Sequence, residues 1–317
     1  MGAWRVWVGE TVTGTSGWLA AIAGATSDTR QAIYDRGANL PPNSGLKDFA
    51  PALRGLSSTP AQLPPADWPD LSVGMPANAL RGLVKIEQAE TENHVAFSVT
   101  CPSGTYTVAW GDGTSNTYAS GATAEHSWVW TDGTPCSEGY RVAVVEVTAT
   151  ATITGLDLIY LPAAWATDWQ GYWSVWLDLY ASLPNLTSLR IGQNREVIIH
   201  RWLRRIGGNL GAIQSNASSM FAYCMSLTRL PDVLNLGNVT NASGMFYFCT
   251  SLTRLPSTGL KVGASLQSTA MGRVALNNFF TGLGTATGSQ VINITSCPGR
   301  TTCDRTIATT KGWTVTG

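Results

Sequence analysis

Two segments of this chain are nearly identical. Residues 216–231 and 241–256 match at 12 of 16 positions with an offset of 25 residues. A period of about 20–29 residues with apolar side chains at fixed offsets is typical of stacked solenoids. One such unit cannot bury its apolar face alone and must stack on neighbouring units. Because solenoids offer extended surfaces, the repeat favours a binding or structural function over catalysis.

Each repeat is expected to hold a short helix (Ala-Ser-x-Met-Phe-x-x-Cys) followed by a strand (Leu-Thr-Arg-Leu-Pro). Stacking places Cys224 above Cys249 as small buried side chains. It places Arg229 and Arg254 outward in register, where the carboxylates of a partner can reach them. These two arginines are therefore predicted binding residues. Residues 183–191 are a degenerate earlier copy of the strand.

The composition limits the class of partner. Charged residues make up 13% of the 317 residues, and 20 basic residues balance 20 acidic ones. A chain without net charge has no electrostatic basis for binding nucleic acid or an anionic membrane. Low net charge promotes self-association, and the 13 tryptophans suit contacts in a large assembly.

Nothing in the sequence indicates export or membrane insertion. No segment reaches about 18 uninterrupted apolar residues, and no basic region followed by an apolar stretch opens the chain. The six cysteines are therefore expected to be free thiols. Disulfides between Cys297 and Cys303 or between Cys101 and Cys136 are the alternatives, and no paired-cysteine motif supports zinc.

Composition and periodicity divide the chain into four parts. The pattern in residues 1–57 predicts a short strand followed by two small helices. Residues 58–81 are a Pro-rich linker. Residues 82–152 carry short alternating strands bounded by Gly, Pro and Asp. Residues 153–317 contain the repeats.

The first part contains the pattern Ala32-Ile33-x-x-x-Gly37-x-x-Leu40-Pro41, followed by Leu46-x-Asp48-Phe49-Ala50-x-x-Leu53. This pattern resembles a helix-turn-helix segment of tailed-phage virion proteins. It implies attachment to a phage particle.

The third part contains a turn motif, Trp110-Gly-Asp-Gly-Thr114, followed by His126-x-Trp128 and Gly139-Tyr-Arg-Val142. In this order the motifs resemble a PKD-type β-sandwich, although the interval between His126 and the last strand is widened. Asp112 is expected to cap its own turn, since one carboxylate lacks the ligands that calcium needs. His126 is expected to bond that turn; a catalytic role is the alternative.

A run of tryptophans opens the solenoid: Trp165, Trp169, Trp173 and Trp176. Their spacing of three and four residues predicts one face of a helix. Such a face can be core or a subunit interface, or its rings can stack on sugars. Trp165, Trp169 and Trp173 are accordingly candidate binding residues.

The Met-Phe-x-x-Cys-x-Ser-Leu-Thr pattern resembles BspA-type leucine-rich repeats. The ending Ala308-x-x-Lys311-Gly-Trp313-x-Val315 resembles the closing cap of such repeats in phage virion proteins. The resemblance covers residues 153–317.

Known catalytic signatures are missing from the sequence, including nucleophile elbows, zinc-protease motifs and phosphate-binding loops. The three histidines lie in separate regions without metal-ligand spacing. The cluster of Glu87, Glu90 and Glu92 resembles the carboxylate pair of a glycosidase, but at a linker edge such carboxylates are expected to be solvated. We therefore expect no catalytic residues, no metal and no cofactor.

Together these features predict an α+β, multi-domain protein with a small N-terminal helical segment, a PKD/Ig-like β-sandwich and a short leucine-rich-repeat solenoid. The expected function is that of a non-enzymatic structural component of a phage particle, at the tail fibre or baseplate. Its partners would be other virion proteins, copies of itself (a trimer is the simplest fibre symmetry) and a host-surface glycan or protein. A capsid decoration protein, a secreted bacterial adhesin and a polysaccharide depolymerase are the alternatives.

Overall fold

The computed structural model describes residues 68–89, 93–159, 172–192, 198–214, 216–231, 233–256 and 258–317. The predicted helical segment 1–57 and residues 58–67 of the predicted linker lie outside these residues. The described chain is mostly β, with a β-sheet region followed by a β-solenoid of about five turns. The α+β prediction is therefore correct for the strands and wrong for the amount of helix.

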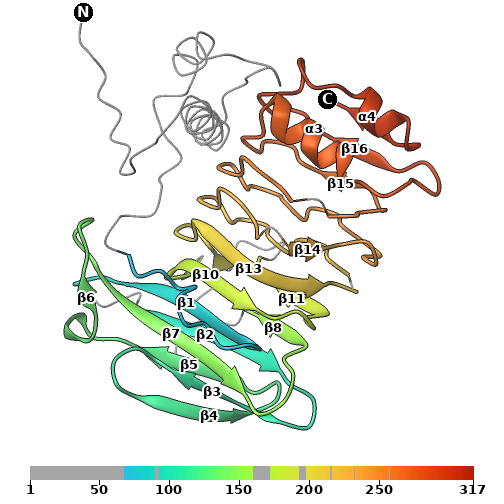
Figure 1. The fold of residues 1–317 in the computed structure, drawn as a ribbon. Helices are drawn as coiled ribbons and strands as arrows, with labels where there is room; N and C mark the ends of the chain where they lie inside the picture. Colours follow the sequence, from blue (N-terminus) through green and yellow to red (C-terminus); the bar gives the residue numbers. More distant parts are fainter. Residues whose placement is uncertain are drawn as a thin grey trace, which may run out of the picture.

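The largest described sheet has the strand order β14-β13-β10-β1-β7-β3-β4, with β6 also paired to β7. Its strands are β1 (Ala79–Ile86), β3 (Thr105–Ala109), β4 (Ser115–Ala119), β6 (Thr134–Pro135), β7 (Arg141–Ala149), β10 (Trp176–Ser182), β13 (Arg205–Ala212) and β14 (Val233–Asn235). Strands from β4 to β10 pair antiparallel, whereas β10, β13 and β14 pair parallel. One continuous sheet thus joins the β-sheet region to the solenoid (Figure 1).

A second sheet has the order β11-β8-β2-β5. Its strands are β2 (His94–Thr100), β5 (Thr123–Ser127), β8 (Gly155–Asp157) and β11 (Ser188–Arg190). Here too the pairing changes, because β2 is antiparallel to β8 while β8 is parallel to β11. The solenoid strands therefore continue both sheets, each at one edge.

Buried side chains of both sheets and of the solenoid form one continuous core. The ring of Phe97 in β2 meets those of Trp110 and Trp176 edge-on, with centroids 6.0 and 5.8 Å apart. Trp176 belongs to β10 and is only 2% exposed. Aromatic contacts of this kind add about 0.5–1.5 kcal/mol each to the burial term.

The predicted tryptophan helix is wrong at its described end. Trp173 lies in β9 (Tyr172–Trp173), which pairs parallel with β12 (Ile198–Ile199), and Trp176 begins β10. Trp165 and Trp169 lie outside the described residues. At the start of the solenoid, β10 pairs along its edge with the antiparallel strand β1, and no tryptophan helix is found among these described residues.

The repeats stack as predicted, but their first halves are turns. The amides of Ser218 and Ser243 donate to the side chains of Asn216 and Asn241, at 2.8 and 2.9 Å. Such side-chain turns compete with helix formation. Left-handed backbone follows at Ser219 (φ 58°) and the equivalent Gly244 (φ 61°), which excludes a continuous helix.

Both halves of each repeat supply core side chains and stacking contacts. Leu227, Leu252 and the two repeat cysteines are fully buried, and Cys249 Sγ donates to the carbonyl of Phe221 at 3.0 Å. Burial raises the pKa of the Cys249 thiol. All six cysteines are free thiols in the structure.

The C-terminal coils use β15 (Ala264–Ser265), β16 (Val291–Asn293) and β17 (Thr314–Thr316), paired in parallel. Helices α3 (Arg273–Thr281) and α4 (Thr306–Thr309) lie at this end, and a short helical turn, η2 (Trp130–Asp132), lies in the sheet region (Figure 1). Trp313 is buried and its Nε1 donates to the carbonyl of Gly284 at 2.8 Å. Lys311 Nζ donates to the carbonyl of Phe280, in the last turn of α3, and to that of Leu283, just after the helix. These bonds satisfy acceptors that the helix end leaves open.

Candidate functional site: an arginine groove

A column of charged side chains crosses the outer face of the solenoid. Asp178 in β10 pairs in register with Arg205 in β13, Arg205 bridges to Arg229, and Arg229 bridges to Arg254. The predicted register of Arg229 and Arg254 is therefore confirmed. The sequence interpretation missed Asp178 and Arg205, because their strands lack the Leu-Thr-Arg-Leu signature of the clear repeats.

Arg205 is neutralised within the fold. Its Nε lies 3.1 Å from both carboxylate oxygens of Asp178, and its Nη2 lies 2.5 Å from Oδ2. Burial, which leaves the Asp178 side chain 1% exposed, raises the pKa of Asp178, while the hydrogen bonds from Arg205 act in the opposite direction. The same hydrogen bonds raise the pKa of Arg205.

Arg229 is the next cation in the column and is exposed. Within the described chain it makes no ion pair or side-chain hydrogen bond, and only a longer-range attraction to Asp178 is found. Adjacent strands lie about 4.8 Å apart, so two guanidinium groups in register repel each other unless an anion lies near them. Arg229 is therefore available to an external acceptor.

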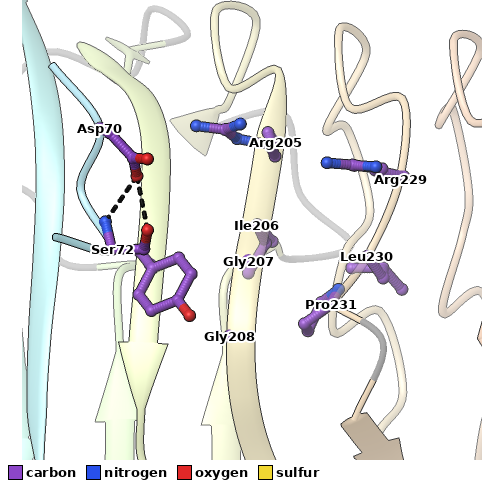
Figure 2. Close-up of a pocket in the computed structure, with 10 residues that line it drawn as sticks. Asp70, Ser72, Arg205, Ile206, Gly207, Gly208, Arg229, Leu230 and Pro231 are labelled. Atoms are coloured by element: carbon purple, nitrogen blue, oxygen red, sulfur yellow. Dashed lines mark hydrogen bonds between the residues drawn. The ribbon is translucent and has the colours of Figure 1, made fainter. Parts of the chain in front are cut away.

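These arginines border a groove of about 340 Å³. Alternate residues of a strand share a face, so Tyr180, Gly207 and Pro231 form a second row beside Asp178, Arg205 and Arg229. Tyr180 also lines the groove, and Figure 2 shows the segment around Gly207 between Asp70 and Arg229. The hollow depends on Gly207, because a Cβ there would lie 2.8 Å from Cδ2 of Tyr180.

The opposite wall of the groove is the turn around Asp70. Asp70 Oδ1 accepts from the amide and the hydroxyl of Ser72, at 2.9 and 2.6 Å (Figure 2). The side-chain and backbone hydrogen bonds from Ser72 lower the pKa of Asp70. Arg81 of β1 holds this turn by donating to the carbonyl of Val73 at 2.6 Å, while its Nε pairs with Glu146.

The remaining predicted binding residues lie elsewhere. Arg254 continues the column but does not line the groove. Trp165 and Trp169 lie outside the described residues, and only the backbone of Trp173 is described. The structure therefore brings Arg229 into a groove without any member of the tryptophan stripe.

The motif histidine has the predicted structural role. His126 Nε2 lies 2.7 Å from Asp112 Oδ2, and its ring stacks on Trp110 at a centroid distance of 4.6 Å. Asp112 Oδ1 accepts from the amide of Thr114 at 2.8 Å, so it caps its own turn as expected.

The described residues contain no group of three or more metal-ligating side chains. Within the same residues, no helix has the length and apolar character needed to cross a bilayer. No protein-family model, curated protein or solved structure matches this chain.

Proposed function

We propose that this protein is a non-enzymatic structural component of a bacteriophage particle, at the tail fibre or baseplate, whose solenoid presents a binding surface. The observation that carries the binding function is the exposed Arg229 at the edge of a preformed groove. Its neighbour Arg205 is held by a buried carboxylate, and both lie on stacked strands joined to a second β-region. A rigid scaffold keeps such a surface organised before binding, which reduces the entropic cost of association.

The particle assignment rests on the sequence resemblances. In this proposal the β-sheet region is of the PKD type, because the Trp110-Gly-Asp-Gly turn contacts His126 and Trp128 in the arrangement that the motif implies. The coils are BspA-type leucine-rich repeats, supported by the stacked repeats and their buried leucines. Residues 1–57 would attach the chain to other virion proteins.

Localisation in intact particles tests this proposal. Phage particles whose genome encodes this chain would be purified from a lysate on a gradient. They would be labelled with gold-coupled antibodies against residues 153–317 and viewed by electron microscopy. We expect gold on the tail or baseplate. Gold on the head would support a decoration protein instead, and a protein that is found in the host cell but not on particles would overturn the proposal.

A second measurement addresses assembly. The proposal includes a homo-oligomer, and a trimer is expected from fibre symmetry. Mass photometry of the purified full-length chain would show a species of three times the 33.7 kDa chain mass, whereas a monomer at all concentrations would contradict the trimer.

A further inference from the structure

The arginine groove carries charge of both signs on opposite walls. Arg229 supplies an exposed cation, and Asp70 supplies a carboxylate at the edge of the turn before β1. Because Arg205 is already paired with Asp178, its positive charge is largely neutralised and contributes less to binding an anionic ligand. Arg205 also attracts Asp70, but without a hydrogen bond or ion pair among the described residues. A ligand therefore meets one exposed cation and one exposed carboxylate.

The hydrogen-bonding capacity of Asp70 is only half used within the described chain. Both donors of Ser72 go to Oδ1, so Oδ2 can accept from a hydroxyl group of a ligand. The hydroxyl of Tyr180 also makes no hydrogen bond to a described residue, and it borders the same groove. These groups suit a ligand with several hydroxyls.

Between the charged walls the groove is lined by Tyr180 and Gly207, which are half-buried, and by Leu230 and Pro231, which are buried. The ring of Tyr180 lies beside Gly207, where an added Cβ would approach its Cδ2 to 2.8 Å. An aromatic ring beside a glycine leaves room for a flat apolar face to stack.

We propose that this groove binds one carboxylate-bearing sugar unit of an acidic saccharide. Its carboxylate pairs with the planar fork of Arg229, its hydroxyls donate to Asp70, and its ring lies on Tyr180. A multiply charged anion is disfavoured because Asp70 repels it, and a purely apolar ligand would leave both charged walls without partners. This inference rests on the proposed function, since it names the ligand class of that binding surface.

Binding of small probes to the full-length chain tests the inference. Glucuronic acid, glucose and acetate would be compared at pH 7 by calorimetric titration and by saturation-transfer NMR. A hydrogen bond to a charged group contributes about 1.5–3 kcal/mol, so glucose should bind at least about tenfold more weakly than glucuronic acid. Acetate, which lacks the ring and the hydroxyls, should also bind more weakly.

Variants locate the site. Arg229→Gln should weaken glucuronic acid about tenfold or more and leave glucose unchanged. Asp70→Asn should weaken glucuronic acid but not acetate. Arg254→Gln is the matched control, since Arg254 is the next member of the column and does not line the groove; it should leave all three affinities unchanged. Circular dichroism would verify that each variant is folded.

Three results would overturn the inference: no binding of glucuronic acid, equal binding of acetate and glucuronic acid, or unchanged affinity in folded Arg229→Gln. The outcome is separable from that of the particle experiment. A protein that is present on particles and binds none of the probes refutes the sugar site alone. A protein that binds glucuronic acid and is absent from particles refutes the virion function alone.

Discussion

Among single residues, His200 makes stability depend on pH. Its side chain is fully buried, and neither ring nitrogen has hydrogen-bond geometry with a described group. Burial lowers the pKa of His200 to about 4, and a weaker interaction with the backbone of Ile191 acts in the opposite direction. The unfolded chain, with an ordinary pKa of about 6.5, binds this proton more readily than the folded chain does.

The stabilisation from a neutral His200 is therefore complete above pH about 6.5 and is lost as pH falls toward 4, by about 3 kcal/mol in total. Urea denaturation at pH 7, 5.5 and 4 would measure it. Because carboxylates also titrate in this range, the matched variant His200→Leu is needed: its stability should fall less over the same interval. Equal losses in the two proteins would show that His200 does not contribute.

Individual side chains differed in how well the sequence predicted them. The contact of His126 with Asp112 followed from a short motif, because turn and histidine both had recognisable neighbours. The pairing of Asp178 with Arg205 did not, because the two residues are 27 positions apart on strands without the repeat signature. Asp70 was also missed, since only the folded chain brings its turn beside the solenoid.

At the scale of secondary-structure elements, the repeat turns depend on left-handed backbone. Gly244 has a φ of 61°, and a Cβ added there would lie in ordinary contact with Ser219 Oγ at 3.5 Å and Tyr247 Cβ at 3.9 Å. A side chain at this position therefore destabilises the fold through the left-handed backbone that it must adopt, and not through a clash with neighbouring atoms. Gly244→Ala should lower the free energy of unfolding by about 1 kcal/mol, as measured by urea denaturation.

Gly288→Ala is the control for this prediction. Gly288 is not in the left-handed region, and the nearest atoms to an added Cβ lie 3.8 Å away. Alanine should therefore be neutral or slightly stabilising there. Equal effects of the two substitutions would refute the role assigned to the turn backbone.

These turns also explain why helices were predicted in the repeats. The pattern Ala-Ser-x-Met-Phe-x-x-Cys places Met220, Phe221 and Cys224 at spacings of one turn of a helix, and all three are buried. The asparagine before it and the left-handed residues within it direct the backbone away from a helix. Periodicity thus identified the buried side chains correctly and the backbone conformation wrongly.

A second prediction at this scale concerns the contact between a solenoid coil and the loop before β7. Arg204 donates to both carboxylate oxygens of Glu138, at 3.0 and 2.7 Å, and its side chain is 7% exposed. Arg204→Met removes the cation from Glu138, which keeps a hydrogen bond from the hydroxyl of Tyr140. The variant should therefore cost about 2 kcal/mol, less than for a fully buried pair because Glu138 is 30% exposed.

Arg190→Met provides the matched comparison. Arg190 pairs with Asp157 at 3.0 Å, but its side chain is 57% exposed. Exposed ion pairs contribute about 0–1 kcal/mol, so this variant should lose less stability than Arg204→Met in the same urea titration. A larger loss at Arg190 would contradict the assignment of burial as the deciding factor.

At the scale of the whole molecule, the predicted boundary between residues 152 and 153 is crossed by both sheets and by the core. Strand β1 pairs with β7 on one side and with β10 on the other, which joins residues 79–86 to residues 176–182. Pairing over such a distance leaves no local pattern in the sequence. The sequence could therefore predict the two kinds of β-structure but not that one sheet contains both.

This continuity predicts that the described region unfolds as one cooperative unit. The fragment 153–317 would lose β1 and β2, leaving the edges of β10 and β8 unpaired. Unprotected edge strands pair with other chains and aggregate. Calorimetry of the full-length protein should thus show one transition for this region, and the fragment should be aggregated or unfolded by size-exclusion chromatography. A monomeric fragment with its own sharp transition would show instead that the solenoid folds without the sheets from which it grows.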